Sequence, residues 1–142
     1  MKDLEVGQVL SLKIRYNNRG DVATSNHPYL IVKIDDVLDV VEIAQLDSLA
    51  GKEYKAAMKS NKTIFYDEPQ EIVIDKDIYV QLDNSLKIEY FDNLSRYRRQ
   101  TDKLSSQKLF DVLNAYNTYH ETYKIEEIKN VYMDRGEILR LN

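Results

Sequence analysis

The chain has 142 residues, carries a formal net charge of −4 at pH 7 and contains no cysteine. This length is typical of one domain built around a single core, so we expect one domain over residues 1–142. Without cysteine there can be no disulfide framework, thiolate nucleophile or thiolate metal ligand. The two histidines, His27 and His120, lie far apart and in no zinc-binding spacing. We therefore expect neither a metal nor any other cofactor.

The distribution of charge limits the partners that the chain can bind. A net acidic chain is unsuited to coating nucleic acid, because such binding needs many basic side chains to neutralise phosphates. Basic residues nevertheless gather in two places, one containing Lys52, Lys55, Lys59 and Lys62 and the other Arg96, Arg98, Arg99, Lys103 and Lys108. Any RNA-binding function must therefore be local.

The apolar runs are short. They reach about six residues, far below the ~20 that span a bilayer, and no charged-then-apolar leader precedes the first strand. We expect a cytoplasmic protein that does not bind membranes.

Three strands are predicted in the first third of the chain. Apolar and polar residues alternate over residues 10–16, which is typical of a strand with one buried face. A turn-rich loop covers residues 17–26, and apolar strands follow at residues 29–34 and 40–46. Each of the last two strands has polar residues at one end, His27 before the second and Asp47-Ser48 after the third.

The middle of the chain is predicted to contain a short helix and further strands. The helix covers residues 52–60 and ends at Asn61, and a turn at residues 66–69 precedes a short strand at 71–74. Alternation at residues 78–82 and 86–90 indicates two strands joined by a hairpin turn at residues 83–85.

A long amphipathic helix is predicted near the C-terminus. Ser105 is a suitable N-cap, and Leu104 can pack on Leu109 as a hydrophobic staple. Apolar and aromatic residues then recur at steps of three and four along one face, which we expect to cover the sheet: Leu109, Val112, Leu113, Tyr116, His120 and Tyr123. A last helix is predicted over residues 125–131, with Gly136 as a break.

The strand pattern resembles the MazF/Kid toxins and, more closely, the type III toxin-antitoxin ribonucleases of the ToxN/CptN/TenpN group. The matching segments are Gly7-Gln8-Val9, His27-Pro28-Tyr29-Leu30-Ile31-Val32 and Leu46-Asp47-Ser48, followed by Lys52 and Lys55. The chain departs from that pattern at Asp47, where relatives more often have Thr, and at Arg19, because the position of the loop arginine varies. The resemblance implies an α+β fold with an SH3-like antiparallel β-barrel, helical excursions and a long C-terminal helix packed on the sheet.

The resemblance also implies an activity and partners. These toxins are metal-independent endoribonucleases that cleave single-stranded RNA, including the precursor of their own antitoxin RNA, and leave a 2',3'-cyclic phosphate. A small structured, pseudoknot-like antitoxin RNA inhibits them in an RNA-mediated oligomeric complex. We therefore expect an RNA partner and no DNA partner.

Metal-free RNA cleavage needs a base, an acid and groups that stabilise charge on the phosphate. The residues predicted to supply them are His27, Asp47, Ser48, Lys52 and Lys55. Histidine ordinarily titrates near neutrality, which suits an acid or a base. Ser48 would hold the phosphate, with Asp47 orienting it or acting as base, while Lys52, Lys55 and Arg19 neutralise charge. Each residue also has an ordinary structural interpretation: a strand-end residue, a turn or helix cap, or a solvated helix face.

Further side chains are predicted to contact RNA through stacking, base edges or phosphates. They are Tyr16, Asn18, Arg19, Tyr29, Lys59, Gln81, Arg96, Arg98 and Arg99. The tyrosines could equally be strand residues chosen for packing. Two other functions stay open at this point: a noncatalytic SH3-like module that binds RNA or protein, and a gyrase-targeting toxin of the CcdB type.

Overall fold

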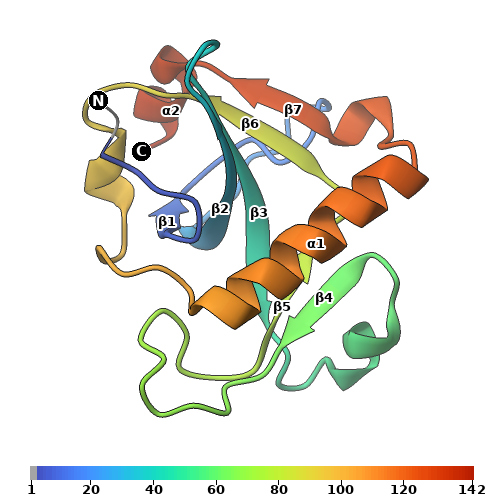
Figure 1. Cartoon of the computed structure of the whole chain (residues 1–142). Helices are drawn as coiled ribbons and strands as arrows, with labels where there is room; N and C mark the ends of the chain where they lie inside the picture. The colour runs from blue at the N-terminus through green and yellow to red at the C-terminus, as the bar shows by residue number, and fades with distance from the viewer. Residues whose placement is uncertain (1–2) are drawn as a thin grey trace.

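The computed structural model describes residues 3–142 as an α+β fold with a mostly antiparallel sheet (Figure 1). The sheet contains β1 (Val9–Leu12), β2 (His27–Asp35), β3 (Val40–Ser48), β4 (Asn61–Ile64), β5 (Ile78–Gln81), β6 (Ser85–Glu89) and β7 (Asn130–Met133). Two α-helices, α1 (Ser106–Thr122) and α2 (Arg135–Leu141), follow most of the strands. The α+β class is thus confirmed, while the strands form an open sheet and the SH3-like barrel stays a prediction.

Strand β3 is the centre of the sheet. It pairs antiparallel with β2 along one edge, and its other edge pairs with β6 near its start and with β5 near its end. The sheet continues from β2 to β1 and from β5 to β4, whereas β6 pairs in parallel with β7. A long central strand with partners on both edges provides a rigid support for the side chains at its end, Asp47 and Ser48.

The predicted hairpin at residues 83–85 is wrong. Strands β5 and β6 do not pair with each other; both lie antiparallel along the same edge of β3, one after the other. Leu46 is opposite Val80, and Ile43 is opposite Leu86. The residues that link β5 to β6 therefore lie along one edge of β3 and do not reverse the direction of the chain. Alternation along two adjacent segments cannot distinguish an interrupted strand from a hairpin.

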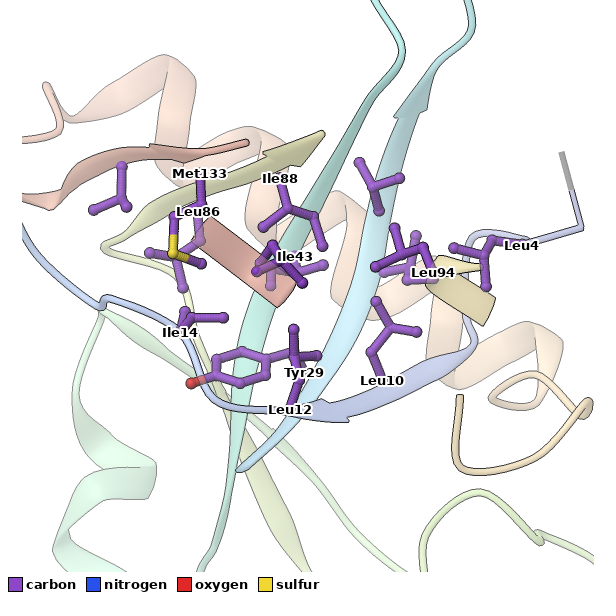
Figure 2. Packing of buried hydrophobic residues seen from close by; sticks show 14 of the residues in the cluster. Leu4, Leu10, Leu12, Ile14, Tyr29, Ile43, Leu86, Ile88, Leu94 and Met133 are labelled. Carbon is purple, nitrogen blue, oxygen red and sulfur yellow. The ribbon is translucent and has the colours of Figure 1, made fainter. Parts of the chain in front are cut away.

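Two apolar cores lie on opposite faces of β3, because successive side chains of a strand point to opposite faces. Val41 and Ile43 belong to one core, shown in Figure 2 with Tyr29, Leu86 and Met133. Ala44 and Leu46 belong to the other core, which α1 covers.

Helix α1 buries Val112 and Tyr116 against the sheet and packs the half-buried Leu109, Leu113 and Tyr119 around them. The predicted buried face ends before Tyr123, which is 42% exposed. Ser105 is the N-cap residue as predicted, but its side chain makes no capping hydrogen bond. Its backbone N–H instead donates to Glu71 Oε2 at 3.2 Å.

The end of the chain differs most from the sequence expectation. The helix predicted over residues 125–131 is a 3₁₀ turn, Glu127–Lys129, followed by β7. Val131 and Met133 are buried while their neighbours in the strand are exposed, so the period is two rather than 3.6. Gly136 lies within α2 and is not a break, because the N-cap Asp134 fixes the start of the helix by accepting from the Glu137 N–H at 2.9 Å.

Other boundaries are also corrected. The first strand ends at Leu12, and beyond it only an isolated bridge joins Arg15 to Val22. The helix expected over residues 52–60 is the shorter 3₁₀ helix Glu53–Ala57, and Asn61 begins β4, a strand that sequence reasoning missed. Residues 71–74 are irregular, although Val73 and Ile74 are buried in the core beneath α1.

Among residues 3–142, no helix is both long and apolar enough to cross a bilayer. Within the same range no three acidic or histidine side chains gather closely enough to hold a metal ion.

Candidate functional site

A pocket of about 240 Å³ lies where β2 begins and β3 ends. His27, Asp47, Ser48 and Arg99 all line it, although they come from three separate parts of the sequence. Apolar side chains complete its wall together with Asp75 and Lys76 of the long loop before β5. We call this the Asp47 pocket. Three of the five residues predicted as catalytic therefore lie together, and Arg99, predicted to contact RNA elsewhere, joins them.

The Asp47 carboxylate is held by two amides. Its Oδ2 accepts hydrogen bonds from Gln81 Nε2 at 2.8 Å and from Gln45 Nε2 at 3.2 Å. Gln81 Oε1 in turn accepts from Asn84 Nδ2 at 3.3 Å. Amides orient a carboxylate without neutralising its charge, so Asp47 is placed to act as a base or as a negative centre. Gln81 positions Asp47, and its predicted contact with RNA stays a prediction.

Two tyrosines lie close to this carboxylate. Burial, followed by the negative charge of Asp47, raises the pKa of Tyr29 far above its ordinary value. Burial, the charge of Asp47 and a hydrogen bond to it also raise the pKa of Tyr79. Both phenols therefore remain protonated at neutral pH and can donate hydrogen bonds but cannot act as bases.

His27 connects the Asp47 pocket to a second hollow of about 290 Å³, which is also lined by Tyr16, Tyr29 and Gln45. Tyr29 pairs with Gln45 across β2 and β3, and His27 and Asp47 lie two residues further along the same face of their strands. The half-buried imidazole is therefore at the junction of two hollows. Tyr16 is 44% exposed at the outer hollow, and its stacking on RNA stays a prediction.

The basic residues predicted for the site divide into two groups. Arg99 is exposed at the Asp47 pocket, and its backbone is fixed there because its N–H donates to the Val9 carbonyl at 2.9 Å. Lys52 and Lys55 do not line this pocket. Lys52 is exposed before the 3₁₀ helix, and Lys55 is half-buried with its Nζ 5.4 Å from the centroid of the Tyr54 ring.

Arg98 and Arg96 make contacts within the protein. The Arg98 guanidinium donates to the Asp3 carbonyl at 2.7 Å, and its backbone bridges Leu10. Arg96 donates to the Tyr97 hydroxyl at 2.8 Å. These two side chains are thus tied to the surface around β1 and do not join Arg99 in the pocket.

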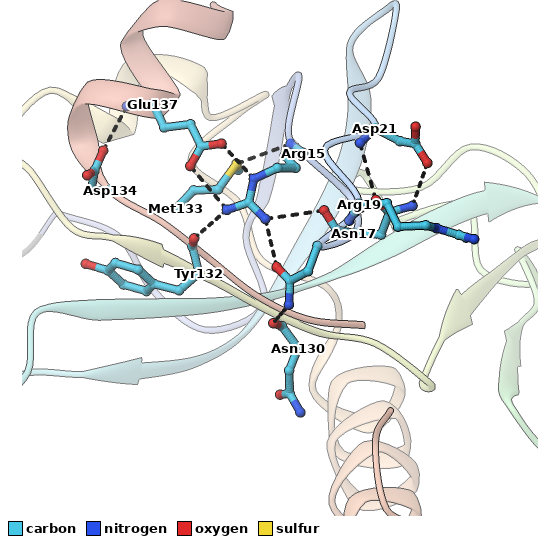
Figure 3. Close-up of polar contacts among 10 residues, drawn as sticks. Arg15, Asn17, Arg19, Asp21, Asn130, Tyr132, Met133, Asp134 and Glu137 are labelled. Atoms are coloured by element: carbon cyan, nitrogen blue, oxygen red, sulfur yellow. Dashed lines mark hydrogen bonds and ion pairs between the residues drawn. The ribbon is translucent and has the colours of Figure 1, made fainter. Parts of the chain in front are cut away.

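Asn18 is part of a structural network around Arg15 (Figure 3). The Arg15 guanidinium donates to both oxygens of Glu137, at 2.8 and 3.3 Å, and to Asn18 Oδ1 at 2.8 Å. Asn18 Nδ2 donates to the carbonyls of Glu127 and Asn130 at 2.8 and 2.6 Å. Asn18 therefore fastens the first loop to β7, while the neighbouring Arg19 side chain extends away from the network.

Lys59 lies outside this site, in a groove between β4 and α1. Sequence reasoning also missed two residues of the site, Gln45 and Tyr79. Gln45 is two residues before Asp47 on one face of β3, and Tyr79 is the register partner of Asp47 on β5. The period of two could have identified Gln45, but Tyr79 required knowledge of the pairing between β3 and β5.

The chain matches no known protein family, no curated protein and no solved structure with which it was compared.

Proposed function

We propose that the protein is a metal-independent endoribonuclease that cleaves single-stranded RNA at the Asp47 pocket. The observation that carries this proposal is the convergence of His27, Asp47, Ser48 and Arg99 on one pocket. An acid–base pair and two groups suited to phosphate are the parts that RNA transesterification needs.

In the proposed reaction, Asp47 or His27 removes the proton of a ribose 2'-hydroxyl. The 2'-oxygen attacks the adjacent phosphorus, the bond to the 5'-oxygen breaks, and the other member of the pair protonates that oxygen. The products are a 2',3'-cyclic phosphate and a free 5'-hydroxyl. Arg99 and the Ser48 hydroxyl bind the phosphoryl oxygens, on which negative charge grows in the transition state. Arg99 thus takes the charge-neutralising role that the sequence analysis assigns to Lys52, Lys55 and Arg19.

We further propose that the chain acts as a toxin in the cytoplasm and that a small structured RNA inhibits it. In this proposal the curved strands around β3 correspond to the SH3-like core of the type III toxins. Inhibition by RNA suits an acidic protein whose cations are gathered locally, because only clustered cations can release counterions from phosphates.

A second candidate is a noncatalytic RNA-binding module. It is favoured by one observation, that Lys52 and Lys55 do not converge with Ser48. A binding module would retain RNA at the same pocket but leave the strand intact.

The test is cleavage of a labelled single-stranded RNA in excess EDTA. We expect cleavage by the natural chain and a loss of roughly 100-fold or more for Ser48→Ala and Arg99→Gln, as is typical when a group that stabilises developing charge is removed. Lys33→Gln, an exposed substitution on β2 away from the pocket, serves as the control and should cleave normally. Binding without cleavage would favour the module, and cleavage that requires Mg²⁺ would contradict the mechanism.

A further inference from the structure

A groove of about 450 Å³ lies between β4 and the second half of α1. We call it the α1–β4 groove. In Figure 1 the second half of α1 runs above β4. Leu82 lines this groove, whereas the preceding residue, Gln81, binds Asp47. Successive side chains of an extended chain point to opposite faces, so the groove and the Asp47 carboxylate lie on opposite sides of β5.

The groove carries two lysine side chains. Lys59 is exposed and Lys62 half-buried, and neither forms an ion pair with any carboxylate among residues 3–142. Asp111 is the one acidic side chain among the lining residues, so two positive charges face one negative charge. The groove is therefore locally positive on a chain of net charge −4.

Aromatic rings form one wall of the groove. The rings of Tyr119 and Tyr123 are 4.6 Å apart between centroids and tilted by 38°. Tyr119 also contacts the ring of His120, which stacks on the buried Tyr116 at 4.0 Å. This series of contacts, which begins in the core, holds Tyr123 in place while 42% of its surface stays exposed. A supported, accessible ring is a surface on which a base can stack.

Neutral polar side chains complete the lining. Asn114, Thr118 and Thr122 project from α1 into the same groove. An amide can donate to and accept from a base edge, and hydroxyls can bind phosphate or ribose oxygens. Cations, a stacking ring and an amide in one groove are the set of groups that proteins use to bind single-stranded RNA.

We propose that the α1–β4 groove is a second RNA-binding subsite, in which a base stacks on Tyr123 and its phosphate lies between Lys59 and Lys62. The choice of RNA as the ligand rests on the proposed function, because the RNA strand would extend from the Asp47 pocket. Among residues 3–142, β4 pairs with β5 along one edge and with no strand along the other, so an RNA strand can pass along that free edge. Asn61 of β4 is opposite Gln81, so an RNA strand that leaves Asp47 reaches the groove by crossing the edge of β4.

The test compares binding of two uncleavable 2'-O-methyl oligonucleotides, of about 4 and about 16 nucleotides, which bracket the site sizes of single-strand-binding domains. Tyr123→Leu should weaken binding of the long strand by about fivefold to a hundredfold, the usual worth of one base–aromatic stack. Lys59→Gln with Lys62→Gln should lower the slope of log affinity against log salt by roughly 0.7, the value for one lost phosphate contact on a single strand. The short strand should be unaffected, because it fills only the Asp47 pocket.

The control is Lys33→Gln with Lys87→Gln, which changes the net charge equally at exposed residues outside the groove. An equal loss in this control, or no loss in the groove variants, would overturn the subsite. Cleavage is measured separately. A natural chain that cleaves RNA while the groove variants bind the long strand normally refutes the subsite alone, and groove-dependent binding without cleavage supports the subsite and refutes the nuclease.

Discussion

Two buried tyrosines make the stability of the fold sensitive to alkaline pH. Tyr29 and Tyr116 are 1% and 0% exposed, and each lies near a carboxylate, Asp47 and Glu42 respectively. The Tyr116 hydroxyl donates to Glu42 Oε2 beneath α1. Burial, together with the nearby negative charge, raises the pKa of both phenols far above 10 in the folded chain. In the unfolded chain they ionise near their ordinary pKa of about 10.

The sign and size of the effect follow from proton linkage. Above pH 10 the unfolded chain releases two phenolic protons that the folded chain retains, so the free energy of unfolding falls as the pH rises. Each group contributes about 1.4 kcal/mol per pH unit, and the two together roughly 2.7 kcal/mol per pH unit. Ion pairs with Asp67 and Asp83 also raise the pKa of Lys108 and Lys129. These lysines add to the slope in the same direction, so the difference between variants is the decisive quantity.

The assay is urea unfolding followed by far-ultraviolet circular dichroism between pH 9 and 11 at constant ionic strength. We expect Tyr116→Phe to lower stability at neutral pH by about 1.5–3 kcal/mol, because it leaves a buried carboxylate without its hydrogen bond. The same substitution should flatten the alkaline slope by about 0.7 kcal/mol per pH unit averaged over pH 9 to 11, since only well above pH 10 does the slope reach about 1.4 kcal/mol per pH unit. Tyr54→Phe, at a side chain 69% exposed, is the matched control. A Tyr116→Phe slope equal to that of the natural chain would refute the reasoning.

Three further predictions concern the scaffold and the boundary of the site. Arg15→Ala should lower stability by roughly 2–3 kcal/mol in urea unfolding and increase hydrogen exchange in α2, because it leaves Glu137 without its bidentate partner; unchanged exchange in α2 would contradict this. Val112→Ala should lower the free energy of unfolding by about 1–3 kcal/mol, because it leaves a cavity beneath α1, and Leu113→Ala should lower it by less because Leu113 is half-buried. A larger loss of stability for Leu113→Ala would contradict this dependence on burial. Arg98→Gln should lower the melting temperature and leave cleavage unchanged, whereas Arg99→Gln should reduce cleavage and leave the melting temperature unchanged. Identical effects of the two substitutions would contradict the separate roles of these arginines.

The sequence was most informative where a single pattern determined the structure. The strands at residues 29–34 and 40–46 and the helix after Ser105 were predicted within a few residues, because long periodic runs bury one face strongly. Short apolar runs were misassigned. Residues 130–133 form a strand because they pair with β6 and not because of their own preference, and local sequence does not contain that pairing.

The same limit applies to the candidate site. Polar residues at the ends of neighbouring strands identified His27, Asp47 and Ser48, because β2 and β3 are consecutive and antiparallel. Arg99 was missed as a pocket residue because its position depends on a backbone contact with Val9, 90 residues earlier. Lys55 is expected at the site because the resembled toxins have lysines after the third strand, whereas the structure places it in the 3₁₀ helix Glu53–Ala57, against the Tyr54 ring.

The chemistry of the cleaved ends tests the central claim most directly. A single-stranded RNA is incubated with the protein in excess EDTA, and the products are analysed by mass spectrometry. The same RNA with 2'-O-methyl groups throughout serves as a second substrate. Attack by the 2'-oxygen, assisted by the Asp47 pocket, predicts a 2',3'-cyclic phosphate and a 5'-hydroxyl from the first strand and no cleavage of the second. A 5'-phosphate product, or cleavage of the methylated strand, would contradict the account.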